Sequence, residues 1–187
     1  MKIRPRINRW TQARRNLVLE SSINSSLVQP HFVVDGQGVN DEISSMPGIF
    51  QQSVDVLIET ISKDVESGIN NHMLFPVIDS SLKDPIASAA HVDDMPLQNA
   101  VRLLREKFGD SIVILTDVCL CTATDHGHCG VIHNEVIDND RTIPVLSKIA
   151  LSHAKAGADY VSASDMMDGR VKSIREELEA NGYSNTG

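Results

Sequence analysis

All three cysteines of the chain lie in one short stretch, directly behind a run of apolar residues. Thiolates bind zinc well, and three protein ligands with an open fourth position are typical of a catalytic zinc rather than a structural one. Cys119 and Cys121 are two positions apart, so in an extended segment both side chains point to the same side. Gly127 lets the chain turn back before it reaches Cys129. The stretch therefore predicts a zinc site made of three thiolates.

Other interpretations of the same stretch stay open. His126 and His128 also lie in it, and they could either complete a closed tetrahedral site or support the loop. The spacing differs from the usual Cys-x-x-Cys of zinc sites. Free cysteines are often simply buried. Three reduced thiols, or one disulfide with a spare thiol, would also fit the sequence.

Side chains suited to proton transfer lie next to the cysteines and at one later position. Asp117 precedes the cysteines, and Ser164 and Asp165 follow a second apolar run. A carboxylate beside a metal could transfer a proton or hold a substrate ammonium group. The structural alternatives are a strand-end cap for Asp117 and a helix N-cap for Ser164 and Asp165. We expect the five other histidines to be structural: His31, His72, His91, His133 and His153.

The elements that must position these residues follow a regular order. We expect strands at 31–34, 72–78, 112–118 and 158–163, and helices at 53–67, 96–108 and 142–156, with a fourth helix marked by Val171, Ile174 and Leu178. A glycine follows each helix, as is common at helix C-termini. Four strand–helix units predict an α/β fold with a parallel sheet. The carboxyl ends of parallel strands share one edge, so Asp117, the cysteines and Ser164 should meet there.

Bulk composition limits the class of protein. The 187 residues suffice for a domain with a substantial core, and 41% of them are hydrophobic. The net charge of -8 argues against nucleic-acid binding by the whole surface. No apolar run approaches the roughly 20 residues that span a bilayer, and the N-terminus has no secretory signal. Few cysteines and no signal predict a reducing cytoplasm without membrane attachment.

The first thirty residues differ from the rest of the chain. They carry a series of basic residues and no acidic residue before Glu20: Lys2, Arg4, Arg6, Arg9, Arg14 and Arg15. Such a segment is compatible with a transit peptide, with a nucleic-acid-binding arm, or with a solvated basic tail. Trp10 is its only aromatic residue, which disfavours nucleic-acid binding.

Two motifs resemble a known family. Residues 117–130 read Asp-Val-Cys-Leu-Cys-Thr-Ala-Thr-Asp-His-Gly-His-Cys-Gly, which closely resembles the metal loop of the porphobilinogen synthases, also called δ-aminolevulinic acid dehydratases. Residues 164–171 resemble a second segment of that family, and Arg4-Pro-Arg6 and Met46-Pro-Gly48 match its early part. The resemblance runs in order along the whole chain. It implies a (β/α)8 TIM barrel, of which the chain covers about the first four units.

The resemblance also implies an organisation and an activity. Residues 1–30 would form an arm that embraces a neighbouring subunit of a homo-oligomer, and residues 31–187 would form the N-terminal half of the barrel. The family condenses two molecules of 5-aminolevulinate to porphobilinogen with loss of water, an early step of heme and tetrapyrrole biosynthesis. By position, Cys119, Cys121 and Cys129 would hold zinc. Asp117 and Ser164 would be catalytic, and Ser164 and Asp165 would bind substrate.

One departure from the family pattern affects activity. The two lysines that form Schiff bases with the substrates, and the ligands of a magnesium ion, lie beyond position 187 in the family. We therefore expect the 187 residues alone to be inactive. The alternatives are a catalytically inactive zinc-binding half-barrel that acts as an interaction or regulatory subunit, and a chain that does not accumulate.

Overall fold

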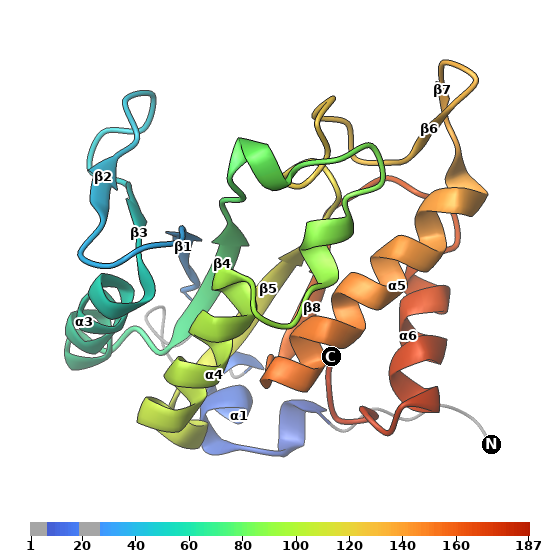
Figure 1. The fold of residues 1–187 in the computed structure, drawn as a ribbon. Coiled ribbons are helices and arrows are strands. Elements are labelled where there is room, and N and C mark those ends of the chain that lie inside the picture. Colours follow the sequence, from blue (N-terminus) through green and yellow to red (C-terminus); the bar gives the residue numbers. More distant parts are fainter. Residues whose placement is uncertain (1–6, 19–26) are drawn as a thin grey trace.

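The centre of the molecule is a six-stranded sheet. The computed structural model describes residues 7–18 and 27–187. The strands are ordered β2-β3-β1-β4-β5-β8 (Figure 1). Neighbours among β1, β4, β5 and β8 pair in parallel. Their bounds are β1 Gln29–Val33, β4 Asn71–Pro76, β5 Val113–Val118 and β8 Tyr160–Ala163. The predicted α/β fold with a parallel sheet is confirmed.

Four helices lie over one face of this sheet (Figure 1). They are α3 Val54–Glu66, α4 Pro96–Phe108, α5 Asn139–Ala156 and α6 Arg170–Ala180. Pro96 occupies the first turn of α4, where its missing N–H costs nothing. Helix α5 begins three residues before the prediction, because the Asp138 side chain caps it by accepting a hydrogen bond from the Arg141 N–H. None of the described helices is long and apolar enough to cross a membrane.

Alternation along the strands divides the side chains between two faces. On β5, Ile114 and Val118 are buried in the layer between the sheet and the helices. Leu115 and Asp117 alternate with these residues and point to the opposite face, which no described helix covers. That face carries half-buried apolar side chains: Phe32, Met73, Phe75, Leu115 and Tyr160. Phe32 and Phe75 stack there with ring centroids 5.4 Å apart. We call these five residues the concave apolar face.

Several short elements were not predicted. The strands are β2 Asn40–Glu42, β3 Phe50–Gln52, β6 Ile132–His133 and β7 Val136–Ile137, and the 3-10 helices are η1 Ile7–Arg9, η2 Ser80–Leu82, η3 Ser88–His91 and η4 Gly109–Ser111. Asn, Asp and Glu are depleted in strands, so β2 gives no strand pattern. Asn134 and Glu135 both adopt positive φ in the β6–β7 turn, as a two-residue hairpin turn of type I′ requires. Elements of two to four residues are too short to show a periodicity.

The described part of the N-terminal segment packs against its own chain. Helix α1, Gln12–Val18, lies at the amino ends of the strands (Figure 1). Arg14 is buried and pairs with Asp159, and the Tyr160 hydroxyl donates to Asn8. Residues 7–18 are therefore not a solvated tail. Lys2, Arg4 and Arg6 lie outside the described residues, and β1 already begins at Gln29.

Residue Gly187 lies beside β8. Its N–H donates to the Asp159 carbonyl over 2.8 Å, and its carbonyl accepts from the Val161 N–H over 3.0 Å. Strand β8 pairs with β5 along one edge. Along its other edge, within the described residues, it makes these two backbone hydrogen bonds to Gly187. Backbone hydrogen bonds therefore occupy this edge of the sheet at Asp159 and Val161.

Acid should destabilise the fold through His153. Its ring is 1% exposed, lies 3.1 Å from the Thr116 hydroxyl, and has its pKa lowered to about 3 by burial. Below pH 6.5 the His153 ring binds a proton in the unfolded chain but stays neutral in the folded chain. The free energy of unfolding therefore falls as the pH drops towards 3. At pH 5 the loss should be about 2 kcal/mol.

Urea unfolding of wild type and His153→Gln at pH 7 and pH 5 measures this effect. The variant should lose about 2 kcal/mol less between the two pH values. His133→Gln, at a partly exposed ring next to Arg141, is the matched control. Equal pH dependence in all three proteins would rule out His153 as the source.

Candidate functional site

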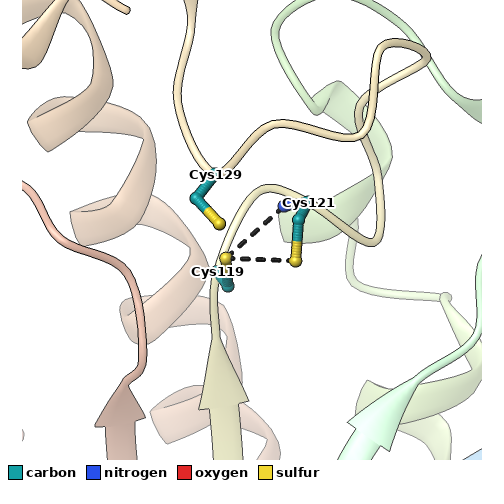
Figure 2. Close-up of side chains that lie close together, drawn as sticks. All are labelled: Cys119, Cys121 and Cys129. Atoms are coloured by element: carbon teal, nitrogen blue, oxygen red, sulfur yellow. Dashed lines mark hydrogen bonds between the residues drawn. The ribbon is translucent and has the colours of Figure 1, made fainter.

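Strand β5 positions the cysteine loop. The chain leaves the strand after Val118, and Cys119 is the first residue beyond it. Cys121 follows on the next turn, and Cys129 returns from the far end of the loop (Figure 2). The Ala123 and Thr124 N–H groups both donate to the Leu120 carbonyl, which closes this turn. The loop lies at the carboxyl ends of the strands, as predicted from the order of elements.

The three sulfur atoms converge. The Sγ atoms of Cys119 and Cys121 are 3.3 Å apart, and all three Sγ atoms lie within 4.8 Å of one another. The Cys121 N–H also points at the Cys119 sulfur over 3.5 Å. In a tetrahedral zinc site with bonds of about 2.3 Å, sulfur atoms are about 3.8 Å apart. All three cysteines are free, so the interpretation as one disulfide with a spare thiol is wrong for this structure.

Burial determines the charge of this cluster. It raises the pKa of the Cys119 and Cys121 thiols, because a thiolate in this environment loses hydration. The neighbouring thiols add to the effect, since like charges gathered in one place oppose ionisation. A bound divalent cation reverses this preference, because a coordinating thiol is deprotonated. The donor set and its spacing therefore fit a thiolate-preferring ion such as zinc.

The two histidines of the loop serve its structure. The Nδ1 atom of His126 accepts from the His128 N–H over 3.1 Å, and its Nε2 atom lies 3.3 Å from the Pro85 carbonyl. The His128 carbonyl accepts from the Thr124 hydroxyl. Among the described residues, the group of potential metal ligands at this loop contains the three cysteines and neither histidine.

A carboxylate and a hydroxyl meet beside the cysteines. The Ser164 hydroxyl donates to the Asp117 carboxylate over 2.5 Å. The register of β5 and β8 brings them together, because Asp117 pairs with Ser162 and the Ser164 N–H continues the ladder to Val118. Burial raises the pKa of Asp117, while the bond from Ser164 opposes that shift. Asp117 and Cys119 line one small cavity.

Asp165 makes its hydrogen bond and its ion pair to the turn that follows it, while its charge adds to the burial that raises the pKa of Asp117. One carboxylate oxygen accepts from the Met167 N–H over 2.7 Å, and the other lies 3.2 Å from Nε of Arg170. Helix α6 begins only at Arg170 and has Gly169 as its N-cap, so the expected N-cap role of Ser164 and Asp165 is wrong. The side chain of Asp165 instead stabilises the turn that leads into α6. Its substrate contact remains a prediction from the resemblance.

Sequence reasoning missed the segment that supports the cysteine loop. Asp84 pairs with Thr124 in an isolated parallel bridge, and its backbone exchanges hydrogen bonds with Ala123 and Asp125. Its side chain accepts from the Ile86 and Ser88 N–H groups. The sequence Asp84-Pro-Ile, a typical turn, was the available signal for this structure.

Gly130 allows the loop to pack closely after Cys129. A Cβ atom there would lie 2.6 Å from Ile137 Cγ2 and 2.9 Å from Thr142 Oγ1. We expect Gly130→Ala to cost about 1–3 kcal/mol by overpacking. Displacing the adjacent Cys129 should also weaken zinc binding, which calorimetry with zinc would measure. Gly127→Asn is the control, because no atom lies within 4 Å there and Asn tolerates positive φ. Unchanged zinc affinity in Gly130→Ala would refute the coupling.

Known proteins resemble this chain over nearly its whole length. A model of the family described as delta-aminolevulinic acid dehydratase matches residues 2–187. A protein of that name from Methanothermus sociabilis is 46% identical over 90% of this chain and 52% of its own length. One from Ruminiclostridium josui is 38% identical over 97% of this chain and 87% of its own length.

A solved structure also resembles this chain over its whole length. The delta-aminolevulinic acid dehydratase of Toxoplasma gondii ME49, in complex with its reaction product porphobilinogen, matches with a TM-score of 0.86 and 40% identity. The match covers all of this chain and 53% of that one. The chain therefore spans about half the length of the Methanothermus and Toxoplasma proteins and forms half of a (β/α)8 barrel.

Proposed function

Because this chain belongs to the delta-aminolevulinic acid dehydratase family, we propose that it serves the condensation of two molecules of 5-aminolevulinate to porphobilinogen with loss of water. This reaction is an early step of heme and tetrapyrrole biosynthesis. The observation that carries the proposal is the convergence of three thiols beside a hydrogen-bonded carboxylate and hydroxyl, at the carboxyl ends of adjacent strands. In (β/α)8 barrels the active site lies at that end.

Cys119, Cys121 and Cys129 would hold zinc. When bound, the metal supplies a Lewis acid that polarises a carbonyl group and lowers the pKa of bound water. The burial of Cys119 restricts water around the sulfur atoms and strengthens their attraction to a cation. Three protein ligands leave one position for substrate or water.

Asp117 and Ser164 would act on the substrate. The bond from the Ser164 hydroxyl orients the carboxylate through one oxygen, and we propose that the other oxygen holds a substrate ammonium group or accepts its proton. Burial raises the pKa of Asp117, which suits a group that transfers protons. Asp165 would support the turn after Ser164 through its ion pair with Arg170. The resemblance implies that Asp165 also contacts the substrate.

The Schiff-base lysines of the proposed reaction need a different source. Five of the described lysines are exposed on helices, and Lys83 lies in the loop after η2. Among the described residues, no lysine belongs to a strand of the sheet, where a buried pocket could depress its pKa. We therefore expect residues 1–187 to need further protein, either in the same polypeptide or in a second one.

A porphobilinogen assay of the protein at its natural length, with zinc and 5-aminolevulinate, tests the proposal. Asp117→Asn should lower kcat at least about 100-fold, because it removes a positioned proton acceptor. Asp125→Asn, at an exposed carboxylate of the cysteine loop, should keep the activity. Absence of product from the natural-length protein would reject the function. Product formation by residues 1–187 alone would reject the requirement for further lysines.

A second function is favoured by one observation. The concave apolar face leaves Phe32, Phe75 and Leu115 half-buried within the described residues, and apolar surface of this kind marks interaction sites. A catalytically inactive zinc-binding half-barrel could cover this face by docking on another protein as an interaction or regulatory subunit. Co-purification with a complete dehydratase, without activity of its own, would favour this alternative.

The remaining features of the proposal concern assembly and environment. We propose that the N-terminal arm contributes to a homo-oligomer, since Trp10 and Val18 are 62% and 52% exposed. Free thiols suit a reducing compartment, which supports a cytoplasmic location. Magnesium would act only through residues outside this chain, as the resemblance implies.

A further inference from the structure

A second group of potential metal ligands lies away from the cysteine loop. It joins His31 on β1, Asp64 on α3 and His72 on β4. All three side chains point into the layer between the sheet and the helices, next to the core residues Val33, Ile61 and Leu74. On the neighbouring strand β5, the residue paired with His72 is Ile114, and about 16 Å of extended strand separates Ile114 from Cys119. The two groups share no residue and are separate sites.

The three ligand atoms form a compact triangle. His31 Nε2 lies 3.1 Å from His72 Nδ1 and 3.5 Å from Asp64 Oδ2, and His72 Nδ1 lies 4.0 Å from Asp64 Oδ2. A point equidistant from these atoms lies about 2.1 Å from each, which is the bond length of zinc to imidazole nitrogen or carboxylate oxygen. An ion can therefore reach all three atoms with little movement of the backbone.

Packing alone does not account for this group. His31 is 5% exposed and His72 is fully buried, and burial lowers their pKa values to about 3 and about 4, so both rings are neutral at pH 7. Oδ2 of Asp64 is buried and accepts no hydrogen bond. A buried carboxylate oxygen beside two neutral rings is costly unless a cation compensates its charge. Neutral imidazole is the form that binds metals.

We propose that His31, Asp64 and His72 bind one divalent transition-metal ion, for which zinc is the probe, as a second metal site. Imidazole and carboxylate ligands suit zinc and its neighbours in the first transition row. The Asp64 side chain is 23% exposed, so an ion can enter from that side and keep a water molecule as its fourth ligand. The site fastens α3 to β1 and β4, and its role is structural.

Metal analysis of a variant without thiols tests the proposal. In the protein at its natural length, Cys119→Ser, Cys121→Ser and Cys129→Ser together remove the thiol ligands. We expect this variant to retain one zinc per chain, and cobalt to give visible absorption bands without thiolate charge transfer. Adding Asp64→Asn, or His31→Leu with His72→Leu, should remove that ion and abolish the zinc-induced rise in Tm. Adding His133→Gln instead should leave both the bound zinc and the zinc-induced rise in Tm unchanged.

The wild-type background gives an independent measurement if the thiol-free variant does not fold. There Asp64→Asn, which keeps the side-chain volume, should lower bound zinc by one ion per chain while cobalt–thiolate absorption stays. Retention of the same zinc content in this variant, or absence of zinc from a folded thiol-free variant, would overturn the proposal. Neither result bears on the condensation reaction, which is assayed separately.

Discussion

Replacing Asp159 with alanine is expected to destabilise the protein by about 3–5 kcal/mol, because it breaks a buried ionic cluster. The carboxylate pairs with Arg14 from α1 and lies 2.7 Å from Nη2 of Arg105 on α4. It also accepts from the Ile114 N–H over 2.7 Å. Burial, together with the nearby Arg105, lowers the pKa of Arg14 to about 10, so the charged guanidinium depends on a compensating carboxylate. Without Asp159, two guanidinium groups lose their buried carboxylate partner, and the Ile114 N–H loses this acceptor.

The free energy of unfolding in urea measures this loss, and Asp110→Ala provides the matched control. Asp110 also faces Arg105, at 3.9 Å, but its side chain is 73% exposed. Exposed ion pairs contribute at most about 1 kcal/mol, so this variant should be close to wild type. If both variants lost the same stability, the cluster would not hold α1 to the sheet as described.

Replacing Cys119, Cys121 and Cys129 together with serine is expected to remove zinc from the loop and to lower porphobilinogen formation at least about 1,000-fold. The metal in such a site supplies several kcal/mol of charge stabilisation, which corresponds to a loss of that size. Activity and zinc content of the natural-length protein, measured on the same preparation, test this prediction. The expected outcome is that both fall together.

His128→Gln is the control for this variant, because His128 lies in the same loop but outside the thiol cluster. It should keep the zinc of the loop and most of the activity. Full activity of the triple serine variant in the absence of added metal would exclude zinc from the proposed reaction. Equal loss of zinc in His128→Gln would instead make the histidine a ligand.

Much of the fold could be predicted because its main elements carry strong local patterns. Strand β5 is a continuous apolar run, and α4 begins at Pro96 and ends before Gly109. Such patterns depend on neighbouring residues alone. The meeting of Asp117 with Ser164 was also predictable, since both follow parallel strands. The approach of Cys129 to the other thiols depended on the resemblance as well as on a glycine-containing loop.

The rest depended on long-range contacts that a local pattern does not contain. His31 and His72 are 41 positions apart and looked like isolated structural residues, but the register of β1 and β4 brings their rings together. Asp165 looked like a helix cap, whereas Arg170 engages its carboxylate and α6 begins later. Arg14 looked like part of a basic tail, and only the fold reveals its partner Asp159.

Crystals of the natural-length protein grown with zinc, and measured at the zinc absorption edge, test the central claim most directly. The anomalous map should show one ion about 2.3 Å from the sulfur atoms of Cys119, Cys121 and Cys129. An empty loop under these conditions, or a disulfide between Cys119 and Cys121, would contradict a zinc site made of three thiolates.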